Sequence, residues 1–69
     1  MSDFRVNANV RVKQYLQHNN SLQDKKAIKA FFIILKTEDL AKARRTALVK
    51  GSKNINYLID NLSQMYSCC

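Results

Sequence analysis

The chain has 69 residues, 46% hydrophobic and 25% charged, with one glycine and no proline, and its formal net charge is +7. This length predicts one small domain over residues 1–69, and the composition excludes collagen-like and disordered chains, so we expect a mainly α-helical fold of three or four helices. The positive charge favours an acidic partner, namely nucleic acid, an anionic membrane or an acidic protein, and argues against a mimic of DNA.

Residues 4–12 alternate between apolar and polar side chains. The apolar side consists of Phe4, Val6, Ala8, Val10 and Val12. A period of two with β-branched residues predicts a strand that is buried on one face. A helical register competes. Its residues, Ala8, Val12, Tyr15 and Leu16, are spaced as on one face of a helix. We favour the strand, followed by a helical turn or the start of a helix over residues 13–17.

A helix is predicted from residue 21 onward, after a break at residues 18–20. Ser21 is followed three positions later by Asp24, the pattern of a capping box, in which the serine hydroxyl accepts an N–H group of the first turn. The apolar stripe consists of Ile28, Phe31, Phe32 and Leu35, and Lys25, Lys26 and Lys29 occupy the N-terminal half. Ile33 and Ile34 widen the apolar surface almost around the last turn, so we expect that end to be deeply buried.

The next helix is predicted over residues 38–50. Thr37 is suited to the N-cap position, and Glu38 and Asp39 carry negative charge where the helix dipole favours it. Gly51 is the expected stop. Around Gly51 this helix and the following one have the outline of a helix-turn-helix, although the second helix offers few basic groups.

The last helix has the clearest amphipathic pattern in the chain, and Ser52 or Asn54 can cap it. Its apolar positions are Ile55, Leu58, Ile59, Leu62, Met65 and Tyr66. We expect a frayed tail from Ser67 onward.

The predicted strand supplies the first candidate site. A lone strand leaves backbone groups unpaired, so two copies are expected to pair into a ribbon between chains. The ribbon would present Arg5, Asn7, Asn9 and Arg11 on one exposed face. Such a ribbon fits the major groove of DNA, where Arg suits guanine and Asn suits adenine. In outline it resembles the ribbon-helix-helix repressors, although the span from Val12 to Ser21 is too short for that family's first helix. The alternative is an ordinary solvated face or a helix.

A second candidate site lies around the helix predicted over residues 38–50. Its cations are Lys42, Arg44, Arg45, Lys50 and Lys53. Phosphate contacts need such a local density of positive charge, and the alternative is a basic face that only keeps the protein soluble. Arg44 falls inside the apolar arc, so we expect it to cover the core or to pair with an acid, the candidates being Asp24, Asp39 and Asp60. The tyrosines lie elsewhere in the sequence, so stacking platforms are not predicted.

The sequence offers little material for catalysis or metal binding. It has no glycine-rich loop and no triad-like constellation, so we expect neither an enzyme nor a cofactor or metal. His18 is expected to be solvent-exposed. Cys68 and Cys69 are adjacent, so neither can form a disulfide that links distant parts of the fold, which favours a reducing, cytoplasmic location. We expect two reactive thiols at these positions. The apolar run over residues 31–35 is far shorter than the ~20 residues of a membrane span. A cationic membrane-active peptide is disfavoured because the basic and apolar stripes lie on different predicted helices, so we expect no membrane partner.

These features predict a cytoplasmic, non-enzymatic DNA-binding regulator. We expect a homodimer, because the core of so short a chain is marginal. The alternative is a protein-interaction module, such as an inhibitor, adaptor or secretion cochaperone, that binds a larger acidic partner through apolar helix faces. The DNA-binding interpretation requires the cations to gather on one side of the molecule.

Overall fold

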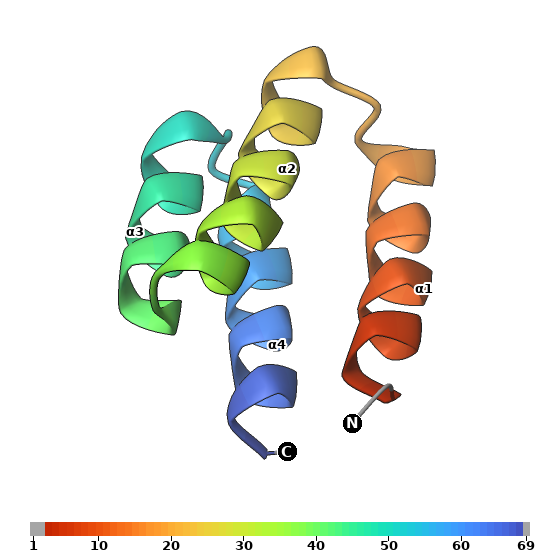
Figure 1. Ribbon diagram of the computed structural model, residues 1–69. Coiled ribbons are helices and arrows are strands. Elements are labelled where there is room, and N and C mark those ends of the chain that lie inside the picture. Colours follow the sequence, from red (N-terminus) through yellow and green to blue (C-terminus); the bar gives the residue numbers. More distant parts are fainter. Residues whose placement is uncertain (1–2, 69) are drawn as a thin grey trace.

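The computed structural model describes residues 3–68 and is built from four α-helices (Figure 1). They are α1 (Asp3–His18), α2 (Leu22–Thr37), α3 (Leu40–Lys50) and α4 (Ile55–Cys68). Successive helices run in opposite directions (Figure 1). The C-terminal ends of α1 and α3 and the N-terminal ends of α2 and α4 therefore lie at the same end of the bundle. This end is uppermost in Figure 1, and we call it the upper end. The prediction of a small, mainly α-helical domain is confirmed.

The core lies between the helices and takes its large side chains mainly from α4. The buried apolar residues are Ala8, Ala27, Ile28, Phe31, Ala43, Ala47, Ile55, Leu58, Ile59 and Leu62. Because α4 repeats its apolar residues every three or four positions, one whole face of it is covered. The other three helices present fully buried alanines, which let helix axes approach closely.

The predicted strand over residues 4–12 is wrong, and the competing helical register is correct. Ala8 is fully buried and Val12 is half-buried, whereas Val6 and Val10 are exposed. A helix satisfies its own backbone groups, so the predicted pairing of strands between two chains loses its basis. The resemblance to ribbon-helix-helix repressors is lost with it.

The start of α2 is as predicted, but its end is not. Ser21 is the N-cap, and its Oγ accepts a hydrogen bond from the backbone N–H of Asp24 at 3.4 Å. The deep burial expected for the last turn is wrong, because Ile33 is 52% exposed and Phe32 is only half-buried. The core-facing side of α2 is the one that carries Phe31, and a step of about 100° per residue turns Ile33 outward.

The helix α3 begins two residues later than predicted. Asp39, not Thr37, is its N-cap, and the Asp39 Oδ1 accepts a hydrogen bond from the backbone N–H of Lys42 at 2.8 Å. Thr37 instead ends α2, and its hydroxyl donates to the Ile33 carbonyl at 3.0 Å. An aspartate at this position satisfies a free N–H of the first turn as well as a threonine would.

Gly51 ends α3 as predicted, although for a different reason from the usual one. Its φ is −87°, so no left-handed conformation requires a glycine there. A Cβ atom on Gly51 would lie 2.6 Å from Cγ2 of Ile55 and 3.2 Å from Cβ of Ala27. The glycine is therefore needed because the turn passes close to the buried side chains of two helices.

The C-terminal predictions are only partly covered by the structure. The helix α4 begins at Ile55, and the backbone N–H of Ile55 donates a hydrogen bond to the Ser52 carbonyl at 3.2 Å. The side chain of Cys68 and all of Cys69 lie outside the described residues. The frayed tail and the expected reactivity of the two thiols therefore stay predictions.

Candidate nucleic-acid interface

The four residues of α1 that were predicted to contact DNA do not share a face. Arg5 and Asn9 lie on one side of the helix and line a groove with residues of α2 and α4. Asn7 and Arg11 lie on the other side and line a separate surface with Met65. All four predicted residues are exposed. A helix turns about 100° per residue, so positions two apart point in nearly opposite directions and the predicted common face is wrong.

Two of the five cations predicted around α3 are engaged in ion pairs. Lys42 Nζ lies 2.9 Å from Glu38 Oε1, and this contact raises the pKa of Lys42. Arg44 Nη2 lies 2.8 Å from Asp60 Oδ1. The expected pairing of Arg44 with an acid is confirmed, and Asp60 is the partner. Arg45, Lys50 and Lys53 are also exposed, and their charged groups form no ion pair within residues 3–68.

The upper end is held together by Asp24, whose side chain is buried. Asp24 Oδ2 accepts hydrogen bonds from the hydroxyls of Tyr15 at 2.7 Å and of Ser52 at 3.0 Å, and Oδ1 accepts from the Ser52 N–H at 2.8 Å. Burial raises the pKa of the Asp24 carboxyl, but the hydrogen bonds from Tyr15 and Ser52 outweigh burial and the net pKa is lowered. Asp24 is therefore an ionised anchor that joins α1, α2 and the turn before α4.

Two more hydrogen bonds tie the four helix ends together. Gln23 Nε2 donates to the Lys50 carbonyl at 3.1 Å, which joins the first turn of α2 to the last turn of α3. Asn54 Nδ2 donates to Asn19 Oδ1 at 3.2 Å, which joins the start of α4 to the end of α1. The backbone that carries the side chains of the upper end is therefore fixed from several directions.

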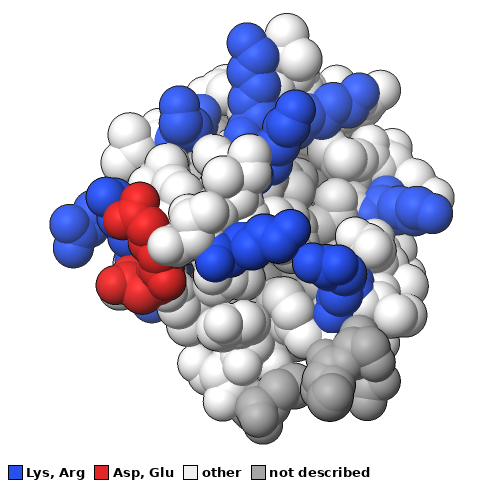
Figure 2. Space-filling view, in the orientation of Figure 1, with Lys and Arg blue, Asp and Glu red and all other residues white. Residues whose placement is uncertain are grey.

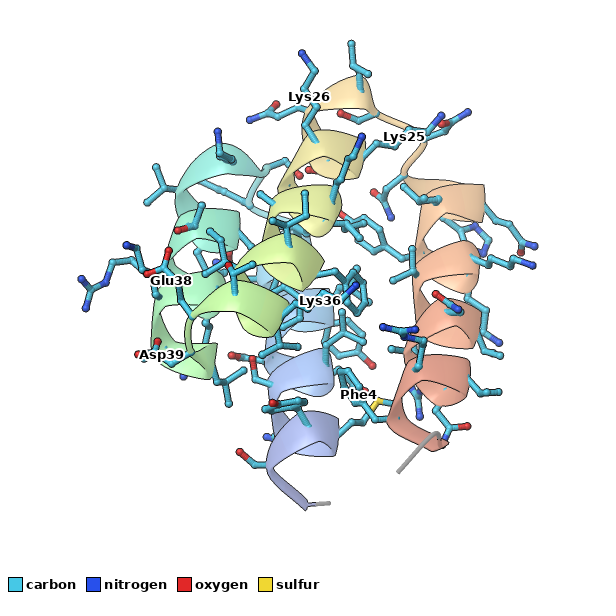
Figure 3. The ribbon with its side chains drawn as sticks, viewed as in Figure 1. Phe4, Lys25, Lys26, Lys36, Glu38 and Asp39 are labelled. Atoms are coloured by element: carbon cyan, nitrogen blue, oxygen red, sulfur yellow. The ribbon has the colours of Figure 1, made fainter. Side chains whose placement is uncertain are left out.

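Four exposed lysines stand on this fixed backbone, and we call them the cationic end. They are Lys25, Lys26, Lys50 and Lys53. Figure 3 labels Lys25 and Lys26 at the upper end, and Glu38 and Asp39 far from them at the left. Asp24 is the one acid among residues 18–29 and 45–56, and it is buried.

The outer face of α2 extends this positive surface. Lys29 and Lys36 are exposed on it, and the exposed residues of α2 include no acid. In Figure 2, blue side chains spread over the upper part and the front of the molecule, whereas the red ones are confined to one place at the left. The predicted DNA contacts include Lys50 and Lys53 but none of the α2 lysines. The acid-free exposed face of α2 is the signal that would have found them.

A polar pocket of about 480 Å³ lies between α1 and α4. The second half of α1 contributes Arg11 and Gln14, and α4 contributes Tyr57 and Asn61. Asn19 and Asn54, which belong to the upper end, also line it, so the pocket adjoins the cationic end. No carboxylate lines this pocket.

An apolar groove of about 380 Å³ lies near the opposite end of the bundle. The ring of Phe4 packs against Tyr66 with centroids 5.1 Å apart and against Phe32 at 6.5 Å. Arg5 and Lys36 line the same groove. The groove therefore combines aromatic surface with two positive charges.

The helix-turn-helix outline at Gly51 gains no support from the side chains. The second helix of the pair, α4, contains no Lys or Arg and buries its apolar face in the core. A recognition helix needs basic or amide groups that reach the bases from its N-terminal part. The cations of this protein lie on α1, α2 and α3 and in the turn before α4.

Comparison of the sequence with models of known protein families, with curated proteins and with solved structures finds no match. Among residues 3–68, no helix combines the length and the apolar character that crossing a bilayer requires. A functional assignment therefore depends on the geometry of the surfaces described above.

Proposed function

We propose that the protein is a small, cytoplasmic, non-enzymatic regulatory module that binds DNA by contacting phosphates with its cationic end. The supporting observation is that Lys25, Lys26, Lys50 and Lys53 stand on a hydrogen-bonded backbone with no exposed acid beside them. Lysine acts as a compact point charge, and phosphate contacts carry no sequence information directly. Binding is therefore expected to depend strongly on salt and weakly on sequence.

The test is the affinity for a labelled DNA duplex, measured by fluorescence anisotropy over a series of salt concentrations. A variant in which all four lysines of the cationic end are replaced by Gln should lose most of the salt dependence. The slope of log K against log salt becomes shallower by about 0.9 for each phosphate that the variant no longer neutralises.

A matched control separates the cationic end from net charge. Replacing Arg5, Lys13, Lys42 and Arg45 by Gln removes the same formal charge from exposed positions on α1 and α3, outside the cationic end and the lysine face of α2. This control should retain most of the slope. An equal loss of slope in both variants would contradict the proposal, because it would show that only the total charge matters.

The second candidate function is a protein-interaction module, and the apolar groove favours it. The aromatic surface around Phe4, together with Arg5 and Lys36, suits an amphipathic acidic segment of a larger partner. Ile33 is half-exposed in this groove, so Ile33→Asp should leave the fold intact and abolish the capture of such a partner. This function would be favoured if the parent protein captured one protein partner even after nuclease treatment and the Ile33→Asp variant captured none.

The homodimer stays part of the proposal, although the pairing of strands no longer supports it. Its remaining basis is the small core of a chain of this length. Sedimentation velocity at micromolar concentration should give the mass of two chains. The mass of a single chain would remove the dimer and leave the lysine contacts untouched.

A further inference from the structure

We propose that the polar pocket between α1 and α4 receives one unpaired nucleotide base, which stacks on Tyr57 while the cationic end holds the neighbouring phosphates. This inference rests on the proposed DNA binding and names the part of the nucleic acid that the protein recognises. It also revises the expectation that the chain has no stacking platform.

Tyr57 supplies the stacking surface. Its side chain is 74% exposed, although it belongs to the first turn of a helix whose next two residues, Leu58 and Ile59, are buried. The Tyr57 hydroxyl has no hydrogen-bond partner within residues 3–68. The core therefore fixes the helix and leaves an aromatic ring at the pocket free to stack on a base.

The polar side chains of the pocket match the edges of a base. Gln14 and Asn61 each carry an amide, which offers both donors and an acceptor. The Asn54 amide nitrogen already donates to Asn19, which leaves the Asn54 carbonyl oxygen to accept from a base. Arg11 adds a guanidinium that suits a phosphate, and no carboxylate in the lining would repel one.

The size and position of the pocket favour a base that has left its stack. Its volume of about 480 Å³ lies in the range of small-molecule sites. A base inside a duplex presents only its edges in the grooves, and its face becomes available for stacking only in a single strand or after it is flipped out. Asn54 lines the pocket and directly follows Lys53 of the cationic end in the chain, so a strand held by the cationic end lies beside the pocket.

The test compares two single strands that carry the same number of phosphates. One is a labelled oligothymidylate of 12 nucleotides, as a rough match to a small binding site, and the other has the same backbone with abasic residues. The parent protein should bind the strand with bases at least about fivefold more tightly than the abasic strand. This factor corresponds to the lower limit of the free energy gained by stacking one base on an aromatic side chain. Tyr57→Ala should remove this preference and leave the affinity for the abasic strand unchanged.

The matched control is Tyr66→Ala, which removes the other exposed tyrosine from the opposite end of the molecule. It should keep the preference for bases, and Tyr57→Phe should keep it as well, because the ring and not the hydroxyl stacks. Circular dichroism of each variant checks that the helices remain.

The remaining outcomes separate this inference from the proposed function. Equal binding of both strands by the parent protein would overturn the base pocket and leave DNA binding intact. Binding of neither strand, nor of duplex, would overturn both. Thymidine monophosphate is the competitor that distinguishes a free nucleotide from a strand. Weak competition supports the strand, and competition as strong as that of the unlabelled strand would overturn it.

Discussion

At the scale of single residues, Asp24 is the side chain on which the upper end depends. It accepts three hydrogen bonds from Tyr15 and Ser52, and it is buried. Asp24→Asn places an amide donor among these three donors and leaves some of them unsatisfied. We expect a loss of about 2–3 kcal/mol in the free energy of unfolding, measured by urea denaturation.

Tyr15→Phe is the matched control for this loss, because it removes one of the three hydrogen bonds and leaves the carboxylate in place. It should cost about 1 kcal/mol. If Asp24→Asn were as stable as the parent protein, the proposed role of Asp24 as an anchor would be wrong.

The same cluster makes stability depend on pH at both ends of the scale. The folded-state pKa of Asp24 lies below its ordinary value of 3.8, so its contribution is present above pH 3.8 and is lost as the pH falls through the lower folded-state value. Burial and the hydrogen bond to Asp24 raise the pKa of Tyr15 from 10.0 to about 12. Its contribution is therefore complete below pH 10 and is lost as the pH rises toward 12.

Urea denaturation at a series of pH values checks both limits. The parent protein should lose stability in acid and again above pH 10, whereas Tyr15→Phe should show a weaker alkaline loss. An alkaline loss of the same size in Tyr15→Phe would show that other groups cause it.

At the scale of elements, the turn between α3 and α4 is the most constrained connection. A Cβ atom at Gly51 would meet the buried side chains of Ile55 and Ala27. Gly51→Ala should therefore destabilise the protein by about 1–3 kcal/mol, as overpacking does, despite the higher helix propensity of alanine. Lys53→Ala in the same exposed turn is the control and should change stability by less than about 0.5 kcal/mol. Thermal unfolding followed by circular dichroism distinguishes the two.

The ion pair between α3 and α4 is expected to matter far less. The side chains of Arg44 and Asp60 are 50% and 56% exposed, and solvent screens an attraction between exposed groups. A double-mutant cycle with Arg44→Ala and Asp60→Ala should give a coupling energy below about 1 kcal/mol. A larger coupling would mean that this contact fixes the position of α3.

The helix α1 also shows why sequence periodicity misled at this scale. Phe4, Ala8 and Val12 are four positions apart, and a spacing of four fits one face of a helix and one face of a strand equally well. Val6 and Val10 completed the alternation and favoured the strand. Only the packing of α1 against the rest of the core showed that these two valines face solvent.

At the scale of the whole molecule, charge repulsion opposes the compact fold. The net charge is +7, and the lysines of the cationic end have no exposed acid near them. We therefore expect the melting temperature to rise as the salt concentration increases from roughly 20 to 200 mM. Over this range the Debye length decreases from above about 10 Å to below it, so the repulsion between the lysines is screened.

The variant with four Gln residues at the cationic end should show a smaller rise. A fall in melting temperature with added salt would instead show that the two ion pairs, Lys42 with Glu38 and Arg44 with Asp60, dominate the electrostatics.

The sequence by itself determined the helical class, the N-cap at Ser21, the stop at Gly51 and the buried face of α4, because these depend on residues that are close together along the chain. Tertiary structure alone decided that α1 is a helix, that Asp24 bonds to Tyr15 and Ser52, and that Tyr57 and Arg11 line the same pocket. Each of these depends on segments that are distant in sequence and meet only when the helices pack. The candidate site was therefore predicted only where its cations belong to one helix and the turn after it, at Lys50 and Lys53.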